Sequence, residues 1–365
     1  MNGVDEKVMA QVLSCFSFDT KPVSWEPYGC GHINLTCLVI TESGRRYIMQ
    51  RMNEHVTKCI PDLMKNINLV TEHLRKKAGE GETVLTLVPT VSGDPYLTHE
   101  SGCWRVYDFV EHSLCLQTAE TVDDFYQSAV AFGHFEEELK DFPIDELNEV
   151  IPDFHNTPNR YRIFHEVLDK DVMNRAAQVK EEIQFVLERE EEMGTLQKLR
   201  ESGELPLRVT HNDTKLNNVL LDADTRKALC VIDLDTVMPG LSLYDYGDSI
   251  RFGAATAAED EKDLSKVEMD LEKFRIYTRG FVSACPGLTD KELELLPMGA
   301  KTMTLECGMR FLTDYLDGDH YFAIHYPDQN LDRCRTQFKL VADMEKKWDK
   351  MQAIVKEECG RFFQQ

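Results

Sequence analysis

Closely spaced cysteine pairs are missing from this sequence. Its 11 cysteines occur singly, and none of them forms a CxxC motif. Single cysteines in odd number give neither the spacing of a zinc site nor the framework of a disulfide-rich secreted domain. The chain is therefore expected to work in a reducing compartment, which indicates the cytoplasm.

Positive charge and long apolar runs are scarce too. The chain has 41 Lys and Arg against 64 Asp and Glu, a net charge of −23, and such a field repels nucleic acids and anionic membranes. No apolar run approaches the roughly 20 residues that span a bilayer, and the polar start MNGVDEKVMA is not expected to be a signal peptide. Neither nucleic acid nor membrane is expected as a partner, and no obligatory protein partner is evident. A nucleotide stays compatible, because it needs only a local cluster of cations and a metal ion.

What the chain does have is an ordinary globular composition, 42% hydrophobic and 29% charged. Its first part is mainly a series of predicted strands. INLTCLVI (33–40) and YIMQRM (47–52) predict a hairpin that turns at Gly44. Pro61 and Asp62 then open a predicted helix, whose apolar residues recur at positions 63, 67, 70 and 74. Three more strands are predicted in TVLTLVPT, PYLTHE and CWRVYDFV.

Beyond position 111 the pattern becomes helical. Long amphipathic helices are predicted over 119–142 and 172–203, and mostly helical sequence resumes after about residue 259. The boundary is placed between Val110 and Ser113. The sequence therefore predicts an α+β fold, with a small β-rich region over 1–111 and a larger, mainly helical region over 112–365.

Polar residues gather around a hairpin in RVTHNDTKLNNVLLDADTRKALCVIDLDTVMPG (208–240). NVLLD and KALCVID predict two short strands, which bring Asp233 back beside the loop that carries Asp213 and Asn218. Magnesium prefers carboxylate oxygens completed by phosphate and water, and a carboxylate can accept the proton of an attacking hydroxyl. Taken singly, these residues are typical of a turn, a helix cap and a strand end. The ordered set H-x-D-x-x-x-x-N, strand, turn, strand, D instead indicates magnesium-dependent phosphoryl transfer.

These stretches resemble the aminoglycoside phosphotransferase and choline kinase family, which has the protein-kinase-like bilobal fold. That family's usual HGD stands here as His211-Asn212-Asp213. The resemblance implies that His211 braces the catalytic loop and that Asp245 ties it to a following helix. It extends over most of the chain, through GCGHIN, WRVYDFVE, IPDFHNTPNRYR, IDLDTVMPG and YDYGDSIRFG.

The same resemblance implies the reacting groups. Asp213 is expected to be the catalytic base, which also contacts the acceptor hydroxyl, while Asn218 and Asp233 bind Mg²⁺ and ATP is the phosphoryl donor. Lys215 is expected to lie near the transferred phosphate, where a cation stabilises the transition state. A salt bridge with a structural function is the alternative for Lys215.

The nucleotide is expected to meet the N-terminal region. Gly29 and Gly31 resemble the glycine-rich cover of kinase phosphates, although two glycines before a strand are also typical of a plain turn. The stretch YDFVE resembles the hinge of that family. Main-chain groups from Phe109 to Glu111 are therefore expected to bind the adenine edge.

The strand that carries a phosphate-binding lysine in protein kinases has none here. Arg51 is its only cation and is the candidate replacement. Strand alternation places Arg51 on one face and Gln50 on the other, and the sequence leaves open which face meets the nucleotide. Glu72 is one candidate for the acidic partner on the helix.

Several of the quoted stretches resemble the branch of the family that phosphorylates N-acetylhexosamines. That likeness implies sugar contacts from His32, Thr236, Arg310 and Tyr321, and transfer to the anomeric hydroxyl of GlcNAc or GalNAc. Arg310 can instead form a surface pair with Asp314, four residues later. The alternatives are a kinase of another small molecule, such as an amino alcohol (choline or ethanolamine), an aminoglycoside or a different sugar, and a nucleotide-binding protein without activity. A protein kinase is disfavoured, because no DFG or APE motif is present.

Overall fold

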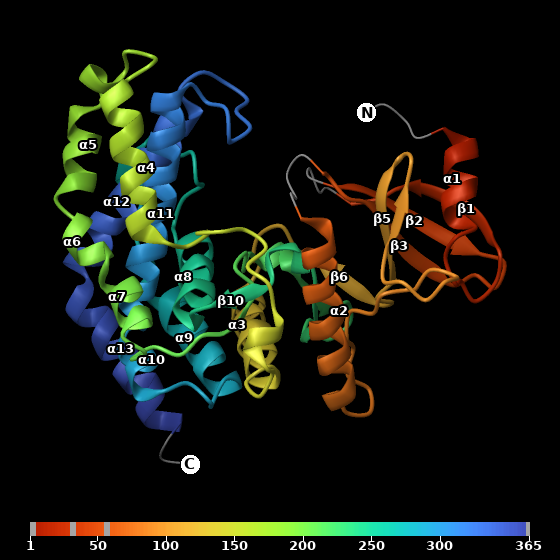
Figure 1. Cartoon of the computed structure of the whole chain (residues 1–365). Helices are drawn as coiled ribbons and strands as arrows, with labels where there is room; N and C mark the ends of the chain where they lie inside the picture. The colour runs from red at the N-terminus through yellow and green to blue at the C-terminus, as the bar shows by residue number, and fades with distance from the viewer. Residues whose placement is uncertain (1–4, 30–33, 55–58, 363–365) are drawn as a thin grey trace.

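The computed structural model describes residues 5–29, 34–54 and 59–362. A β-rich N-terminal region and a larger helical C-terminal region lie at opposite ends of the molecule (Figure 1). The predicted α+β fold class is confirmed. No helix in these described ranges is long and apolar enough to cross a membrane.

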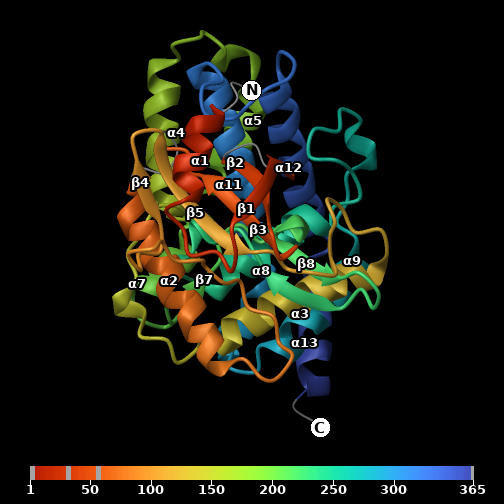
Figure 2. The same cartoon turned by 90° about the vertical axis from the view of Figure 1, so that its right-hand side faces the viewer.

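The N-terminal region contains one antiparallel sheet with the strand order β1-β2-β3-β5-β4. Its strands are β1 (Pro22–Pro27), β2 (Leu35–Thr41), β3 (Arg46–Arg51), β4 (Leu97–His99) and β5 (Gly102–Asp108). The predicted hairpin is formed by β2 and β3. Met49, Trp104 and Val106 share a fully buried cluster with Met9 and Val12, so helix α1 (Glu6–Leu13) covers this outer face. Alternate residues of the strands point to the inner face, toward the C-terminal region. In Figure 2 the sheet lies in front of that region.

Helix α2 (Ile60–Lys77) joins the two regions. It begins as predicted, with Pro61 in its first turn, where the missing N–H costs no hydrogen bond. The buried side chains of Leu63 and Met64 share a cluster with Leu234. Asn66 is also buried, and its Nδ2 donates to the carbonyl of Val237 over 2.9 Å. The helix therefore holds the segment that follows Asp233 against the N-terminal sheet.

Two of the three later strand predictions are correct, and TVLTLVPT (83–90) forms no strand. It runs beside β5 through an isolated bridge between Leu87 and Tyr107 and a 2.8 Å bond from Val88 N to Val106 O. Pro89 follows, and proline has no N–H with which to continue a ladder.

The helix predicted over 119–142 forms as α3 (Val122–Glu138), but the prediction over 172–203 differs from the structure. That stretch contains α5 (Lys180–Leu187), α6 (Glu190–Met193) and α7 (Thr195–Glu201). Gly194 separates the last two, and glycine is a poor helix former. Val186, Met193 and Leu196 are each buried against the helices beside them, so tertiary packing has set the breaks.

The rest of the C-terminal region is two small sheets and a group of helices. The predicted hairpin is confirmed as β8 (Val219–Asp222) and β9 (Ala228–Val231), with β6 (Ser113–Cys115) paired to β8. β7 (Arg208–Thr210) pairs with β10 (Met238–Gly240). The remaining helices are α4 (Thr157–Lys170), α8 (Ser242–Gly253), α9 (Leu271–Ala284), α10 (Asp290–Glu294), α11 (Leu296–Asp317), α12 (Gln329–Lys346) and α13 (Trp348–Phe362).

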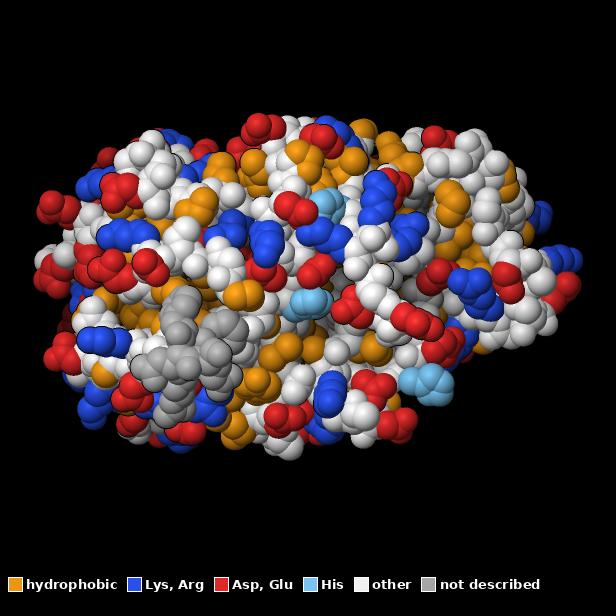
Figure 3. Space-filling model, turned by 90° about the horizontal axis from the view of Figure 1, so that it is seen from below, with side chains coloured by type: hydrophobic (Ala, Val, Ile, Leu, Met, Phe, Trp, Pro, Cys, Tyr) orange, Lys and Arg blue, Asp and Glu red, His pale blue; other side chains and the backbone are white. Residues whose placement is uncertain are grey.

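Charge is distributed rather than segregated on the face seen in Figure 3, where acidic and basic side chains are interspersed over both regions. All ten cysteines in the described part of the chain are free thiols.

Helices α8 and α11 cross so closely that both need glycine. A Cβ at Gly247 would lie 2.4 Å from the carbonyl oxygen of Gly299. Gly247→Ala is therefore expected to lower the free energy of unfolding by at least about 2 kcal/mol, because the two backbones must separate. Denaturant unfolding measures this change. Gly360→Ala is the matched control, since a Cβ there meets no atom within 4 Å, and equal losses in both variants would contradict the assignment.

Candidate active site

The loop predicted to be catalytic, residues 211–218, follows β7 and is held by Asp245 of α8. Its carboxylate accepts the backbone N–H groups of His211 over 2.7 Å and of Asn212 over 2.6 Å. Burial raises the pKa of Asp245 to about 6, although both N–H groups and His211 favour its charged form. His211 donates from Nε2 to the carbonyl of Ile232 over 2.9 Å. These contacts are of the kind that the family resemblance implies for His211 and Asp245.

Asn212 stands where the family usually has glycine. Its φ of +65° lies in the left-handed region, where asparagine is one of the few side chains that fit. The side chain also ties two loops together, because Nδ2 donates to the carbonyl of Thr236 over 2.9 Å. Asparagine in place of glycine is therefore compatible with the left-handed backbone at this position.

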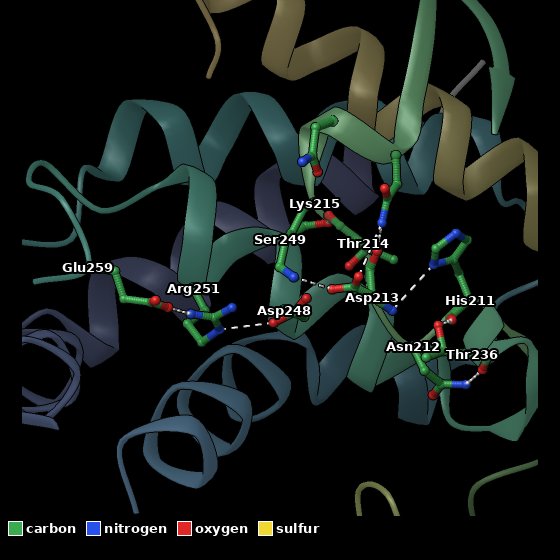
Figure 4. Close-up of polar contacts among 12 residues, drawn as sticks. His211, Asn212, Asp213, Thr214, Lys215, Thr236, Asp248, Ser249, Arg251 and Glu259 are labelled. Atoms are coloured by element: carbon green, nitrogen blue, oxygen red, sulfur yellow. Dashed lines mark hydrogen bonds and ion pairs between the residues drawn. The ribbon is translucent and has the colours of Figure 1, made fainter. Parts of the chain in front are cut away.

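The loop presents Asp213 between a cation and an amide. Lys215 Nζ lies 2.7 Å from Asp213 Oδ1 (Figure 4). On the other side, Asn218 Nδ2 lies 3.2 Å from Asp213 Oδ2. Asn218 Nδ2 also donates to the Asp213 carbonyl over 2.8 Å. Since the amide nitrogen faces Asp213, the amide oxygen of Asn218 remains available to another ligand.

The hairpin returns Asp233 to this loop, as its sequence predicts. Ile232 N donates to Asn218 O over 2.9 Å, which fixes the neighbouring residue beside the loop. The pKa of Asp233 is raised to about 6, because nearby protein atoms reduce the hydration of its carboxylate and the carboxylates of Asp235 and Asp213 repel its charge. The residue as a whole remains exposed. Because the repulsion from Asp235 and Asp213 is only partly offset by Arg105, the Asp233 carboxylate suits a further cation.

A divalent ion would find few protein ligands here. Over the described ranges, no three His, Cys, Asp or Glu side chains are placed to hold a metal ion by themselves. The Asp233 carboxylate and the Asn218 amide oxygen provide two oxygen donors of the kind that Mg²⁺ prefers, and the ion keeps water and phosphate as its other ligands. The donor set therefore fits magnesium carried in with a nucleotide.

Lys215 is held in its charged form. Burial disfavours the charge, but Asp213 and Asp248 outweigh it and raise the pKa of Lys215. Asp248 is itself fixed by Arg251 over 2.9 Å, and Arg251 contacts Glu259 over 2.7 Å (Figure 4). Lys215 is thus a charged side chain that forms an ion pair with Asp213, the predicted catalytic base.

Part of the predicted phosphate cover lies outside the described residues. Gly31 falls there, and so does His32, which was predicted to contact the sugar. Gly29 has φ +78°, a conformation that favours glycine. Asn34, just after the gap, donates from Nδ2 to Asp235 Oδ2 over 2.9 Å, which joins the N-terminal region to the segment that carries Asp233.

The predicted hinge residues line a pocket of about 480 Å³ with Arg45, Arg46 and Arg75, a volume within the usual range for small ligands. Phe109 N donates to the carbonyl of Arg46 over 3.2 Å, so this N–H is already occupied. The Glu111 carboxylate forms an ion pair with Arg46. Any adenine contact from this segment therefore has to use its other main-chain groups.

The cation that faces the C-terminal region is not Arg51. Arg51 is exposed and shares the outer face of β3 with Tyr47 and Met49, which pack toward α1. On the inner face, Arg105 of β5 is only 1% exposed, and its Nη1 lies 2.5 Å from Asp235 Oδ1. The position of Arg51 therefore argues against the predicted nucleotide contact.

Glu72 does not pair with this arginine either. Its carboxylate accepts from Asn68 of its own helix over 3.2 Å. The contact that α2 makes with Arg105 is the Met64 sulfur, 4.0 Å from Nη1. Sequence reasoning missed Arg105 and Asp235, although both stand inside stretches that carry the family resemblance, WRVYDFVE and IDLDT.

The described residues among the predicted sugar contacts lie in two groups. Thr236 donates its hydroxyl to the His211 carbonyl over 2.6 Å, beside the catalytic loop. Arg310 contacts the Tyr321 hydroxyl over 3.3 Å and lies 5.4–5.6 Å from the ring centres of Phe154, Tyr321 and Phe322. Tyr321 is 70% exposed and can meet a ligand.

Arg310 does not form the surface pair with Asp314. That carboxylate instead accepts the backbone N–H groups of residues 320–322, each over 2.8–2.9 Å. Phe154 connects the arginine to the catalytic loop, because the next residue, His155, donates from Nε2 toward the Asn212 carbonyl over 3.4 Å.

One family model and several solved structures of kinases are similar to this chain. A family model described as "Phosphotransferase enzyme family" matches residues 24–271. A microcompartment-associated aminopropanol kinase has a similar structure, with a TM-score of 0.61 and 17% identity over 95% of this chain and 98% of that chain. An amicoumacin kinase in complex with AMP-PNP and Ca²⁺ gives 0.57 and 15%, over 94% of each chain. Choline kinase from Cryptosporidium parvum Iowa II gives 0.56 and 12%, over 91% of each. At these identities the likeness concerns the fold.

Proposed function

This chain belongs to the phosphotransferase enzyme family, and from that premise we propose that it is a kinase of N-acetylhexosamines. In this proposal it transfers the γ-phosphoryl group of ATP directly to the anomeric hydroxyl of GlcNAc or GalNAc. Residues 1–111 meet the nucleotide, and residues 112–365 carry the catalytic loop and the acceptor site. The observation that carries the phosphotransferase part is the convergence of Asp213, Lys215, Asn218 and Asp233 on one loop and its returning strand.

Each of these groups has a task in the transfer. Asp213 accepts the proton of the attacking hydroxyl, whose oxygen forms the new bond to phosphorus as the bond to ADP breaks. Lys215 lies beside the base and stabilises negative charge on the transferred group. Asn218 and Asp233 hold the divalent ion, which neutralises phosphate charge when bound. The AMP-PNP and Ca²⁺ in the amicoumacin kinase structure support such a site.

The charges around Arg310 support the choice of a sugar rather than a cationic acceptor in this proposal. The Arg310 guanidinium already lies over the rings of Phe154, Tyr321 and Phe322, which a quaternary or primary amine would otherwise use. Burial and the charge of Arg310 lower the pKa of the neighbouring Arg160. Two adjacent guanidinium groups repel choline and aminoglycosides, whereas the carbonyl of an acetamido group accepts hydrogen bonds from them.

An anomeric hydroxyl also suits the single carboxylate available. It is more acidic than an ordinary alcohol, so Asp213 with the bound ion suffices without a stronger base. The proposal therefore needs no residue beyond those already described near the loop.

A panel of acceptors tests this function. Purified protein with ATP and Mg²⁺ is expected to consume ATP with GlcNAc or GalNAc, and NMR is expected to place the phosphate on C1. The methyl glycoside of the same sugar should give no product, because its anomeric oxygen is blocked. Preferred turnover of choline, ethanolamine or an aminoglycoside would replace the sugar assignment, and no turnover with any acceptor would favour a protein without activity.

A further inference from the structure

A continuous line of polar side chains crosses the inner face of the N-terminal sheet. Gln50 Nε2 of β3 donates to Thr36 Oγ1 of β2 over 3.2 Å, and Arg105 Nε of β5 donates to Gln50 Oε1 over 2.9 Å. The line ends at Asp235, whose Oδ1 lies 2.5 Å from Arg105 Nη1. Residues far apart in the sequence thus bring one buried guanidinium to the segment that follows Asp233.

Gln50 marks the place of a missing cation. In protein kinases, the third strand of the small lobe carries the lysine of V-A-I-K, which binds nucleotide phosphates and pairs with a helix glutamate. YIMQ occupies that strand here and ends in Gln50. The guanidinium of Arg105 is hydrogen-bonded to this very side chain, so a positive charge lies beside the lysine position although it comes from a neighbouring strand.

Arg105 has unused capacity for an anion. Its only carboxylate partner among the described residues is Asp235, and no hydrogen bond from its Nη2 is formed within the same ranges. The Asp235 Oδ1 atom is buried and close to Nη1, yet it receives no hydrogen bond of normal geometry. A phosphate offers a guanidinium two parallel acceptors, which is a better match than this single contact.

We propose that Arg105 binds the phosphate oxygens of the nucleotide in place of the missing strand lysine, and that Asp235 holds the guanidinium until the nucleotide arrives. This inference rests on nucleotide use in the proposed function.

Binding of adenosine, ADP and ATP, each measured with Mg²⁺, tests whether Arg105 recognises phosphate. The alternative is that Arg105 only forms a structural contact with Asp235. Isothermal titration is made on the full chain and on Arg105→Gln, Arg105→Lys and the double variant Gln50→Lys/Arg105→Gln. Arg105→Gln is expected to weaken ATP binding by about 30-fold or more relative to adenosine, because a buried charge-assisted contact to phosphate is lost. Arg105→Lys should keep the ATP-to-adenosine ratio within about tenfold of the parent, because lysine retains the positive charge although it loses the two parallel donors. The double variant should regain at least about tenfold of the loss, since it restores a cation at the neighbouring position.

Arg189→Gln controls for general loss of stability. It breaks the 2.8 Å ion pair with Glu345 among the C-terminal helices, and it is expected to lower Tm without changing the ATP-to-adenosine ratio. Equal weakening of adenosine and ATP in Arg105→Gln, or no weakening at all, would overturn the assignment. If Arg105→Gln does not fold, a double variant that folds without regaining discrimination overturns it as well.

The nucleotide-binding experiment does not depend on which acceptor the protein phosphorylates. Loss of phosphate discrimination in a protein that phosphorylates no sugar would remove the proposed function and keep Arg105 as the phosphate ligand. Unchanged discrimination in a protein that phosphorylates GlcNAc would do the reverse, and a parent protein that binds no adenine nucleotide would remove both.

Discussion

Asp213→Asn is expected to lower kcat by about 10³-fold or more and to leave the Kd for ATP within about threefold of the parent. An amide cannot accept the proton of the attacking hydroxyl, and general base catalysis contributes about 10²–10⁴-fold by itself. The replacement has the same size, and the backbone contacts of His211 and Asn212 with Asp245 are untouched. ADP release in a coupled assay measures kcat, and titration with the nucleotide measures Kd.

Asp224→Asn is the matched control for this variant. Asp224 is exposed at the turn of the same hairpin, where its N–H contacts Asp222, and no part of the proposed chemistry uses it. It is expected to keep kcat within about twofold. If Asp213→Asn also retained kcat within tenfold, Asp213 would not be the base.

Asp233→Asn is expected to lower kcat by about 10²–10⁴-fold and also to weaken binding of ATP in the presence of Mg²⁺ by tenfold or more, since it removes the one carboxylate among the proposed metal ligands. Asparagine tolerates the left-handed backbone of this position, where φ is +61°, so the fold should survive. ATP binding without Mg²⁺ should change little, and the comparison of titrations with and without Mg²⁺ measures the difference.

Asp213→Asn and Asp233→Asn are expected to change different measurements. Asp213→Asn affects turnover with normal nucleotide binding, whereas Asp233→Asn affects both turnover and the response to Mg²⁺. Equal Kd values for ATP with Mg²⁺ in Asp233→Asn and the parent protein would remove Asp233 from the metal site.

The sequence predicted best those features that depend on neighbours along the chain. The hairpin of β8 and β9 follows from its apolar strands and polar turn, and it returns Asp233 to the loop of Asp213 and Asn218 as expected. The start of α2 follows from Pro61 and the helical spacing of its apolar residues. The α+β fold class follows from the change between strand and helix patterns near residue 111.

Features that depend on distant neighbours were predicted poorly. Alternation separates Arg51 from Gln50 but does not identify the face that meets the C-terminal region, which is set by α1 on one side and by Asp235 on the other. Arg105 comes from another strand, more than fifty positions after Gln50. The breaks in 172–203 likewise result from packing against other helices, which local periodicity does not contain.

A structure of the chain with Mg²⁺ and a nonhydrolysable ATP analogue would test whether Asp213, Asn218 and Asp233 form one phosphoryl-transfer site. We expect that Asn218 and Asp233 would be the protein ligands of a metal ion beside the phosphates, and that Asp213 would face the γ-phosphate. A metal ion bound elsewhere, or a γ-phosphate remote from Asp213, would contradict it.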